Sequence, residues 1–599
     1  MLNFLPWCLF IVCCLSPLCY ADITADTRSA AACELPQINS EPIWWKESVA
    51  YQVYLKSFKD ANGDGIGDIR GLIQKLDYLK GLGVDIIWIT PHYDSPNKDN
   101  GYDISDYRKV LKEYGTMQDF EELAAGIKKR GMHLMVDVVT NHTSNEHKWF
   151  VESRKSKNNP YRDYYIWRDG KNGGPPNNDV SYFGGSAWEK DDATGQYYLH
   201  YYSKNQPDLN WDNPKVREEI KAMLQFWIDR GVTGLRMDSI STISKNAMFT
   251  DLTPQQIAHF PEVYAAGPHI HDYLKALRNS LSQYNDLVII GELPGVNLNK
   301  VLLFVDNRAK QLDMPILFNI IYLGRDTVTR WKQTFPVTLS GLRKEICRSN
   351  TALGNHGWNS FFIGNHDNPR ALSQFGSDDP KWRVSSAKAL ATLLLTQRGT
   401  PFIYQGDEIG MTNFPYARIS DFSDIEIKGF WKQYVESGQV SPEEFLKNIK
   451  ITARENSRTP YQWDSSKQAG FTSGTPWINI NPNYKEINLK KELSSSTSVY
   501  AYYKKMIAVR HRIPALTYGS YEDFDLANNA VYAYTRTLGD ERYLIVINFT
   551  SQTANYTLPK GLTLKATVIE SDGTIKIAPK RNALTLRPWQ SGIYALHRS

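Results

Sequence analysis

Residues 234–238 read Gly-Leu-Arg-Met-Asp, a short run that ends in an acidic residue. Two later stretches end in the same way: Val-Ile-Ile-Gly-Glu at 288–292 and Gly-Asn-His-Asp at 364–367. An apolar run of four to eight residues is typical of a strand that is buried on both faces of a parallel sheet. Because burying an acid is costly unless it faces a cleft or a partner, we expect these acids to share a functional site.

The sequence around these stretches alternates β-rich apolar runs with longer amphipathic segments, from about residue 49 to residue 500. This alternation indicates βα units on a parallel sheet. We expect eight strands, at 49–55, 84–90, 133–139, 234–238, 287–292, 314–320, 360–365 and 401–404. The Gly-x-Gly-x-x-Gly turn of a dinucleotide fold is absent from the sequence. The predicted fold class is therefore α/β, as a (β/α)8 TIM barrel rather than an open doubly wound sheet.

The rhythm of strands and helices breaks in two places and ends in a third. Residues 141–214 are rich in Asn, Gly, Pro and Tyr, which predicts a subdomain inserted after the third strand, and a second insertion is expected at 410–468. The tail switches to short alternating strands, such as 530–537 and 543–549, which predict an antiparallel β-sandwich. The expected division is a signal peptide at 1–21, the barrel at 40–140 and 215–517, subdomain B at 141–214 and the sandwich at 518–599.

The first 21 residues contain an apolar run and end in Cys-Tyr-Ala, with small residues at the positions that precede a secretory cleavage site. No Lys or Arg precedes the run, which departs from the usual signal. A membrane anchor is the alternative, but the run is shorter than the ~20 residues of a spanning helix. We therefore expect a secreted protein without a membrane span in its mature chain. Four of the six cysteines lie in this segment, which leaves Cys33 and Cys347, and whether these two pair stays open.

The charge pattern argues against nucleic acid as a partner. The net charge is +5, and the sequence has no basic block or polybasic tail. The 16 Trp and 35 Tyr residues would suit a sugar as well as core packing, because their flat faces carry a polar edge. We expect a small sugar as the partner; the sequence does not determine the oligomeric state.

The three strand-end acids are Asp238, Glu292 and Asp367. Active sites of TIM barrels lie at the C-terminal ends of the strands, and a retaining glycosidase needs two carboxyl groups about 5–5.5 Å apart. One such acid alone is more often a helix cap or an ion-pair partner. For the set of three we predict Asp238 as nucleophile, Glu292 as acid/base, and Asp367 as a ligand for sugar hydroxyls. Arg236, two residues before Asp238 and on the same face, is expected to keep Asp238 ionised.

Four segments carry a family resemblance. Asp-Val-Val-Thr-Asn-His at 137–142, the stretch at 234–238, Ile-Gly-Glu at 290–292 and Asn-His-Asp-Asn at 365–368 resemble, in that order, the signature regions of glycoside hydrolase family 13. The motif Gln-Pro-Asp-Leu-Asn at 206–210 resembles the signature of the oligo-1,6-glucosidase branch. The resemblance implies further residues that bind the glucosyl unit, namely Asp99, Tyr102, His142, Gln206, His366 and Arg458.

A metal site is also considered. His142 and His366 have no close His or Cys partner at ligand spacing, which argues against zinc. The loop at 60–68 places oxygen-bearing residues at alternate positions, as calcium prefers, although Gly71 stands where an EF-hand needs Glu. It resembles the structural calcium loop of the same branch, which implies as ligands Asp60, Asn62, Asp64, the Ile66 carbonyl and Asp68. The alternative is an Asx-rich turn without metal. No organic cofactor is expected.

Over nearly the whole mature chain the sequence resembles sucrose isomerases, for example in Trp-Trp-Lys-Glu at 44–47 and Gly-Gly-Ser-Ala-Trp at 184–188. The resemblance implies that sucrose is cleaved, that fructose is kept in the pocket, and that the two sugars are rejoined at another hydroxyl. Such isomerisation depends on excluding water and on holding fructose.

The chain departs from the isomerase pattern where the acceptor sugar would bind. Phe318 and Phe183 are kept, whereas Pro294 stands where a clamping Phe is expected and Tyr202 replaces another Phe. The isomerase loop Arg-Leu-Asp-Arg-Asp here reads Tyr322, Leu323, Gly324, Arg325 and Asp326. We therefore expect a sucrose isomerase with substantial hydrolysis. A plain α-glucosidase is the first alternative, and an inactive relative that serves as a receptor or transporter subunit is the second.

Overall fold

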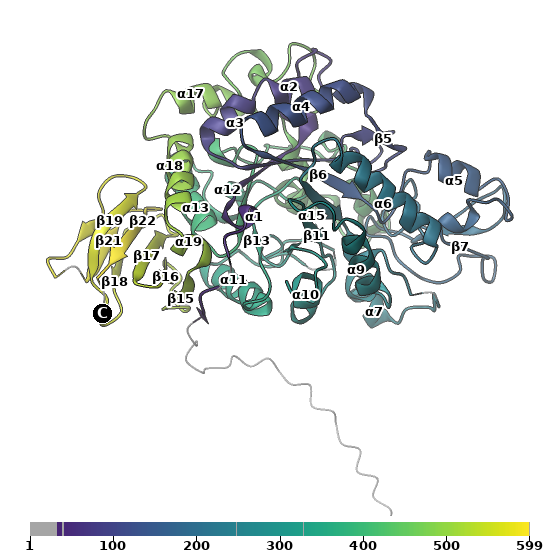
Figure 1. The fold of residues 1–599 in the computed structure, drawn as a ribbon. Coiled ribbons are helices and arrows are strands. Elements are labelled where there is room, and N and C mark those ends of the chain that lie inside the picture. The colour runs from purple at the N-terminus through teal and green to yellow at the C-terminus, as the bar shows by residue number, and fades with distance from the viewer. Residues whose placement is uncertain (1–32, 39–40, 247, 327–328, 581, 598–599) are drawn as a thin grey trace, which may run out of the picture.

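The structure, a computed structural model, describes residues 33–38, 41–246, 248–326, 329–580 and 582–597 (Figure 1). The expected signal peptide at 1–21 lies outside these residues. Within the described ranges, no helix combines the length and the apolar character that crossing a membrane requires.

The centre of the molecule is a parallel sheet of eight strands in the order β12-β11-β10-β6-β3-β2-β14-β13. The strands are β2 (Ala50–Val53), β3 (Ile86–Ile89), β6 (His133–Val139), β10 (Gly234–Asp238), β11 (Val288–Glu292), β12 (Met314–Ile316), β13 (Ser360–Phe361) and β14 (Thr400–Tyr404). The two end strands also meet, because the Ser360 hydroxyl donates to the Pro315 carbonyl at 2.5 Å. The predicted TIM barrel is confirmed.

Two predicted strands run four residues past the observed ends. The strand expected at 314–320 ends at Ile316, and the strand expected at 360–365 ends at Phe361. In both cases the chain leaves the sheet early because the following residues turn at the mouth of the barrel, where Phe318 and Asp367 line the cavity described below. Apolar character continues through this wall, so the sequence pattern does not mark the strand end.

Helices follow the strands around the barrel. The longer ones are α3 (Leu76–Leu82), α4 (Met117–Lys129), α6 (Pro214–Ile228), α9 (Ile270–Ser280), α10 (Leu298–Val305), α11 (Leu339–Leu353), α13 (Arg383–Thr396) and α18 (Val499–Arg512). Shorter elements are α1 (Trp44–Glu47), α2 (Ile69–Ile73), β4 (Tyr93–Asp94), β5 (Asp106–Val110), α7 (Pro254–Ala258), α8 (Phe260–Tyr264), α12 (Ala371–Phe375), α17 (Leu489–Leu493) and α19 (Ala515–Tyr518). Local sequence sets their starts: Asn213 caps α6 with Pro214 in its first turn, and Thr116 caps α4.

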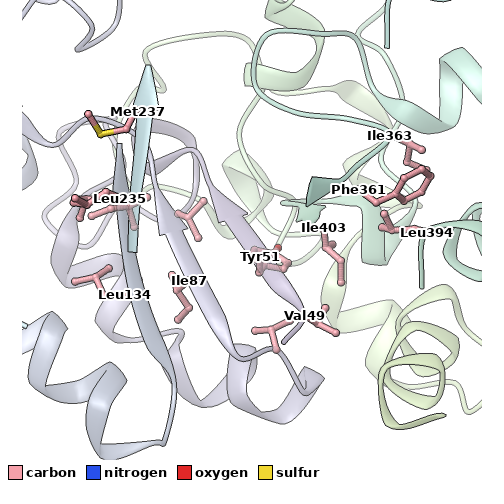
Figure 2. Close-up of a cluster of buried hydrophobic side chains, with 14 of the residues drawn as sticks. Val49, Tyr51, Ile87, Leu134, Leu235, Met237, Phe361, Ile363, Leu394 and Ile403 are labelled. Carbon is pink, nitrogen blue, oxygen red and sulfur yellow. The ribbon is translucent and has the colours of Figure 1, made fainter. Parts of the chain in front are cut away.

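The strands alternate between two buried faces, which places the acids. Leu235 and Met237 of β10 belong to a cluster that also contains Leu394 of α13, so they pack between barrel and helices (Figure 2). Arg236 and Asp238, one residue out of phase with them, take the other face of the strand. Glu292 follows Val288 and Ile290 of β11 on this inner face, where both belong to a second cluster. The strand ends thus bring the acids into the barrel mouth.

Two long segments are inserted between the barrel elements, and the first of them lies at one side of the barrel (Figure 1). After β6 come α5 (Lys148–Ser153) and an antiparallel sheet of β7 (Trp167–Arg168), β8 (Trp188–Lys190) and β9 (Tyr197–Leu199). After β14, the chain forms α14 (Ile425–Phe430), α15 (Pro442–Thr452) and α16 (Glu455–Arg458). Both segments supply residues to the barrel mouth.

The C-terminal part contains two antiparallel sheets, in the orders β1-β15-β16-β17-β22-β19 and β18-β21-β20. Their strands are β1 (Cys33–Leu35), β15 (Ser520–Asp523), β16 (Val531–Leu538), β17 (Glu541–Asn548), β18 (Ala554–Thr557), β19 (Leu564–Glu570), β20 (Lys576–Ile577), β21 (Ala583–Leu586) and β22 (Ser591–Leu596). Leu544 of the first sheet and Leu584 of the second share one buried cluster, so the sheets pack face to face as a sandwich.

A disulfide answers the question that the sequence left open. Cys33 pairs with Cys347, with their Cα atoms 6.0 Å apart. Cys33 lies in β1, at the edge of the C-terminal sheet, and Cys347 lies in α11 of the barrel. The bond therefore fastens the start of the described chain to both of its large parts.

Candidate active site

A cavity of ≈ 510 Å³ opens at the C-terminal ends of the barrel strands. The predicted site residues that line it are Asp99, Tyr102, His142, Phe183, Gln206, Asp238, Glu292, Pro294, Phe318, Tyr322, Gly324, Arg325 and Asp367. Arg236, His366 and Arg458 are buried behind this wall and contact residues that form it. Asp326 does not line the cavity; its carboxylate accepts from the backbone N–H of Thr329 instead.

Arg236 connects the two acids on neighbouring strands. One terminal nitrogen lies 2.6 Å from Asp137 and 2.7 Å from Asp238, and the other lies 2.7 Å from Glu292. Arg236 is only 1% exposed. A buried cation that bridges several carboxylates fixes their positions, and charge-assisted bonds to it favour their ionised forms. The candidate nucleophile and the candidate acid are therefore held at opposite ends of one planar guanidinium.

The two bridged acids are buried in a polar but confined site. Burial raises the pKa of Glu292 to about 7; Asp238 and Asp367 add to this rise and Arg236 opposes it. Burial likewise raises the pKa of Asp238 to about 6, again against the effect of Arg236. Near neutral pH, this arrangement favours an ionised Asp238 beside a Glu292 that can carry a proton.

Asp367 has the opposite electrostatic environment. Although burial alone would raise its pKa, His366, Arg458 and Arg454 hold the pKa of Asp367 well below its usual range. Its carboxylate lies 3.0 Å from His366, 2.7 Å from Arg458 and 3.4 Å from Arg454. The Tyr102 hydroxyl lies 2.6 Å from the same His366 nitrogen. Asp367 is thus a permanently charged acceptor in the cavity wall.

Another part of the cavity wall is a hydrogen-bonded group around Asp99. Its carboxylate oxygens contact Arg454 at 2.9 Å and the Gln206 side-chain amide at 3.1 Å. His142 lies 3.2 Å from the same Gln206 nitrogen, and burial lowers the pKa of His142 to about 3. His142 is therefore neutral at physiological pH and suited to hydrogen bonding with sugar hydroxyls. The structure brings these four residues together, three of them predicted.

The sequence interpretation missed Arg454 and its buried partner Asp424. Arg454 contacts Asp99, Asp367 and Asp424, and Arg458 contacts Asp367 and Asp424 as well. The spacing of four residues between Arg454 and Arg458 is one helical turn, and this signal could have found Arg454. No local pattern connects either arginine with Asp424, which lies 30 residues before Arg454.

The acceptor side of the cavity carries the departures from the isomerase pattern. Phe318 and Tyr322 stack with ring centroids 5.3 Å apart, and the Arg325 guanidinium lies 5.6 Å from the Tyr322 ring centroid. Gly324 has φ +85°, and a Cβ there would lie 2.7 Å from the Phe335 carbonyl oxygen. An Asp at 324 would therefore clash with the present backbone. Pro294 also lines the cavity and has no aromatic ring.

The loop at 60–68 carries side-chain oxygen atoms of the kind that bind a metal ion. Asp60 and Asp68 are both 3% exposed, yet their carboxylates accept mainly from backbone N–H groups, as in a closed turn. The Asn62 and Asp64 side chains also accept from the loop backbone. Within the described ranges, no three His, Cys, Asp or Glu side chains are grouped to hold a metal ion. The donor chemistry suits calcium, and calcium stays a prediction for this loop.

Calcium binding would stabilise the fold, because an ion that binds only the folded chain adds about 2.7 kcal/mol at 100 times its dissociation constant. We expect Ca²⁺ to raise the Tm by several degrees over the chelated protein in differential scanning calorimetry. Asp64→Ala should abolish this rise with little change in the chelated Tm, since Asp64 is exposed. An equal Tm with Ca²⁺ and with chelator would reject the prediction.

The barrel, its mouth and the bridged carboxylates define a carbohydrate-processing TIM-barrel enzyme. Two family patterns match the chain: "Alpha amylase, catalytic domain" over residues 52–519 and "Alpha-amylase SusG C-terminal domain" over residues 531–593. The chain belongs to the α-amylase family, glycoside hydrolase family 13.

Relatives cover almost the whole chain. An oligo-1,6-glucosidase from Parageobacillus thermoglucosidasius is 49% identical over 93% of this chain and 99% of its own length. A variant isomaltulose synthase from Erwinia rhapontici NX5, solved in complex with its natural substrate sucrose, is 58% identical with a TM-score of 0.92 and covers 93% of this chain and 100% of its own. The trehalulose synthase from Pseudomonas mesoacidophila MX-45 is 57% identical with a TM-score of 0.91 and the same coverage.

Proposed function

We propose that this protein isomerises sucrose to trehalulose or isomaltulose through a covalent β-glucosyl–Asp238 intermediate, with part of the sucrose hydrolysed. The observation that carries the proposal is the bridge of Arg236 between Asp238 and Glu292 at 2.7 Å each. The similarity to an isomaltulose synthase solved with sucrose supports the choice of substrate.

In the first step, the Asp238 carboxylate attacks the anomeric carbon of the glucosyl unit while the bond to the fructosyl oxygen breaks. Glu292 gives its proton to that oxygen, which leaves fructose and a glucosyl ester on Asp238. In the second step, another fructose hydroxyl attacks the anomeric carbon of the glucosyl–Asp238 ester, the bond from that carbon to the Asp238 oxygen breaks, and Glu292 takes up the hydroxyl proton. Water in place of fructose gives glucose. Asp367 and the group around Asp99 hold the glucosyl hydroxyls through both steps.

The pH profile follows from the two acids. Asp238 must be ionised to attack, so activity should fall as the pH drops below about 6. Glu292 must be protonated to assist the leaving group, so activity should fall as the pH rises above about 7. We expect a narrow bell-shaped profile of kcat/KM on sucrose with its maximum between these values. A profile that stays flat up to pH 9 would contradict the role of Glu292.

The balance between isomerisation and hydrolysis should depend on residue 294. Pro294 and Phe318 both line the cavity, and Pro294 lacks the aromatic face that would cover the acceptor. Pro294→Phe is expected to raise the ratio of isomers to free glucose severalfold, since an aromatic wall there excludes water and holds fructose. Pro294→Leu is the control, because it restores an unconstrained backbone without an aromatic ring. Chromatography of the products measures the ratio, and the same ratio in all three proteins would reject this role.

A plain α-glucosidase is the second candidate function. The oligo-1,6-glucosidase relatives favour this function. The lack of an aromatic ring at Pro294 in the cavity wall favours it as well. The bridged carboxylates argue against the inactive receptor alternative. Faster turnover of isomaltose than of sucrose, without isomer formation, would favour the hydrolase.

We also propose that the mature protein is secreted. The Cys33–Cys347 disulfide supports this proposal, because such bonds persist in oxidising compartments. N-terminal sequencing of protein from the culture medium of its host tests it, with a start near residue 22 as the expected result.

A further inference from the structure

Ser239 follows Asp238 directly, and its backbone has a conformation that residues other than glycine rarely adopt. Its φ is +44°, in the left-handed region. This turn aims two donors at Glu292: the Ser239 N–H donates to Oε2 at 2.9 Å, and the Ser239 hydroxyl donates to the same oxygen at 3.4 Å. Arg236 contacts the other oxygen, Oε1. Both carboxylate oxygens of Glu292 therefore have partners. The second hydrogen bond to Oε2 forms only when the Ser239 hydroxyl points toward it.

Tyr202 determines where that hydroxyl points. The Tyr202 hydroxyl lies 2.6 Å from the Ser239 Oγ. Since Ser239 donates to Glu292, Tyr202 is the donor in this contact. Burial, the neighbouring Tyr182 and the carboxylates of Asp238 and Glu292 raise the pKa of Tyr202, so its proton is present throughout the working range. The result is a chain of hydrogen bonds from Tyr202 through Ser239 to Glu292.

The inserted segment holds Tyr202 firmly in place. Its ring stacks on Tyr182 with centroids 4.9 Å apart and meets the ring of Phe183 edge-on at 5.7 Å. Its carbonyl accepts from the Ser181 hydroxyl at 2.6 Å. A phenylalanine at 202, which the isomerase pattern predicts, would keep this packing and lose the hydroxyl. The hydrogen-bond chain is therefore a feature that this sequence adds to its site.

We propose that Tyr202 and Ser239 are positioning residues for Glu292, with the Tyr202 hydroxyl orienting the Ser239 hydroxyl on Oε2. The inference rests on the proposed role of Glu292 as acid/base. Other charged or titratable groups that interact with Glu292 are Arg236 and Asp238 on β10, Asp137 on β6, Asp367 after β13, and Tyr182. The hydroxyls of Tyr202 and Ser239 can be removed without changing a charge beside Glu292.

Tyr202→Phe and Ser239→Ala test the proposal through the alkaline limb of the kcat/KM profile on sucrose. A donor to a carboxylate favours its ionised form, so removing it should raise the pKa of Glu292 and move this limb to higher pH by about half a unit. The double variant should shift no further than Ser239→Ala alone, because both changes break one chain. A merely structural role would change the rate without moving the limb.

Tyr182→Phe is the matched control. It removes a hydroxyl from the stacked neighbour, and within the described structure that hydroxyl has no hydrogen-bond partner. It should leave the pH of the alkaline limb unchanged. An unmoved limb in both Tyr202→Phe and Ser239→Ala, or additive shifts in the double variant, would overturn the proposal. Glu292→Gln distinguishes a failure of this positioning proposal from a failure of the proposed function. If Glu292→Gln stays fully active, Glu292 is not the acid/base.

Discussion

Glu292→Gln is expected to lower kcat/KM on sucrose by about 10²–10⁴-fold, the usual contribution of a positioned proton donor. Glutamine has nearly the same shape, and its amide oxygen can still accept from Arg236, which contacts Glu292 at 2.7 Å. The loss therefore reports on the missing proton rather than on a collapsed site. Steady-state kinetics at the pH optimum measure it, with circular dichroism as a check of the fold.

A substrate that needs no proton separates the acid role from other effects. Fluoride leaves α-glucosyl fluoride with much less help from an acid than a fructosyl oxygen needs. Glu292→Gln should therefore retain most of its rate of glucosyl–enzyme formation on this substrate, measured as fluoride release in a first turnover. Full activity on sucrose, or an equal loss on both substrates, would contradict the assignment.

Asp238→Asn is expected to lose activity on both substrates by roughly 10⁴-fold or more, as variants without their nucleophile do. A neutral amide is a poor nucleophile at the anomeric carbon, and even a good leaving group such as fluoride does not compensate for the loss of the carboxylate. Arg236 keeps its contacts with Asp137 and Glu292 in this variant, so the fold should persist.

The contrast between the two variants on α-glucosyl fluoride is the informative result. Asp238→Asn should be inactive and Glu292→Gln active. Intact-protein mass spectrometry of Glu292→Gln during turnover should show an added glucosyl mass, which Asp238→Asn should lack. Glucosyl adducts on Asp238→Asn would place the nucleophile elsewhere.

Much of this site was predictable because the chemistry lies at strand ends. Each acid follows a short apolar run, and the period of two along β10 puts Arg236 and Asp238 on one face. These local patterns are enough to predict a barrel and a shared mouth for Asp238 and Glu292. They do not locate the ends of β12 and β13, because apolar residues continue into the cavity wall.

Long-range contacts were beyond sequence reasoning. Arg454 joins Asp99 to Asp367, although it lies in an insertion far along the chain from both. Cys33 and Cys347 are 314 residues apart, and nothing local pairs them. The Tyr202–Ser239 contact likewise connects the inserted segment to a strand end. Tertiary packing decides such pairs, and a single sequence does not encode them as a pattern.

Product analysis on sucrose tests directly whether the protein isomerises this sugar. The purified protein is incubated with sucrose at its pH optimum, and the sugars are separated by anion-exchange chromatography against trehalulose, isomaltulose, glucose and fructose standards. We expect trehalulose or isomaltulose together with glucose and fructose from the unaltered protein, and none of these products from Asp238→Asn. Glucose and fructose as the sole products of the unaltered protein would contradict sucrose isomerisation and leave an α-glucosidase.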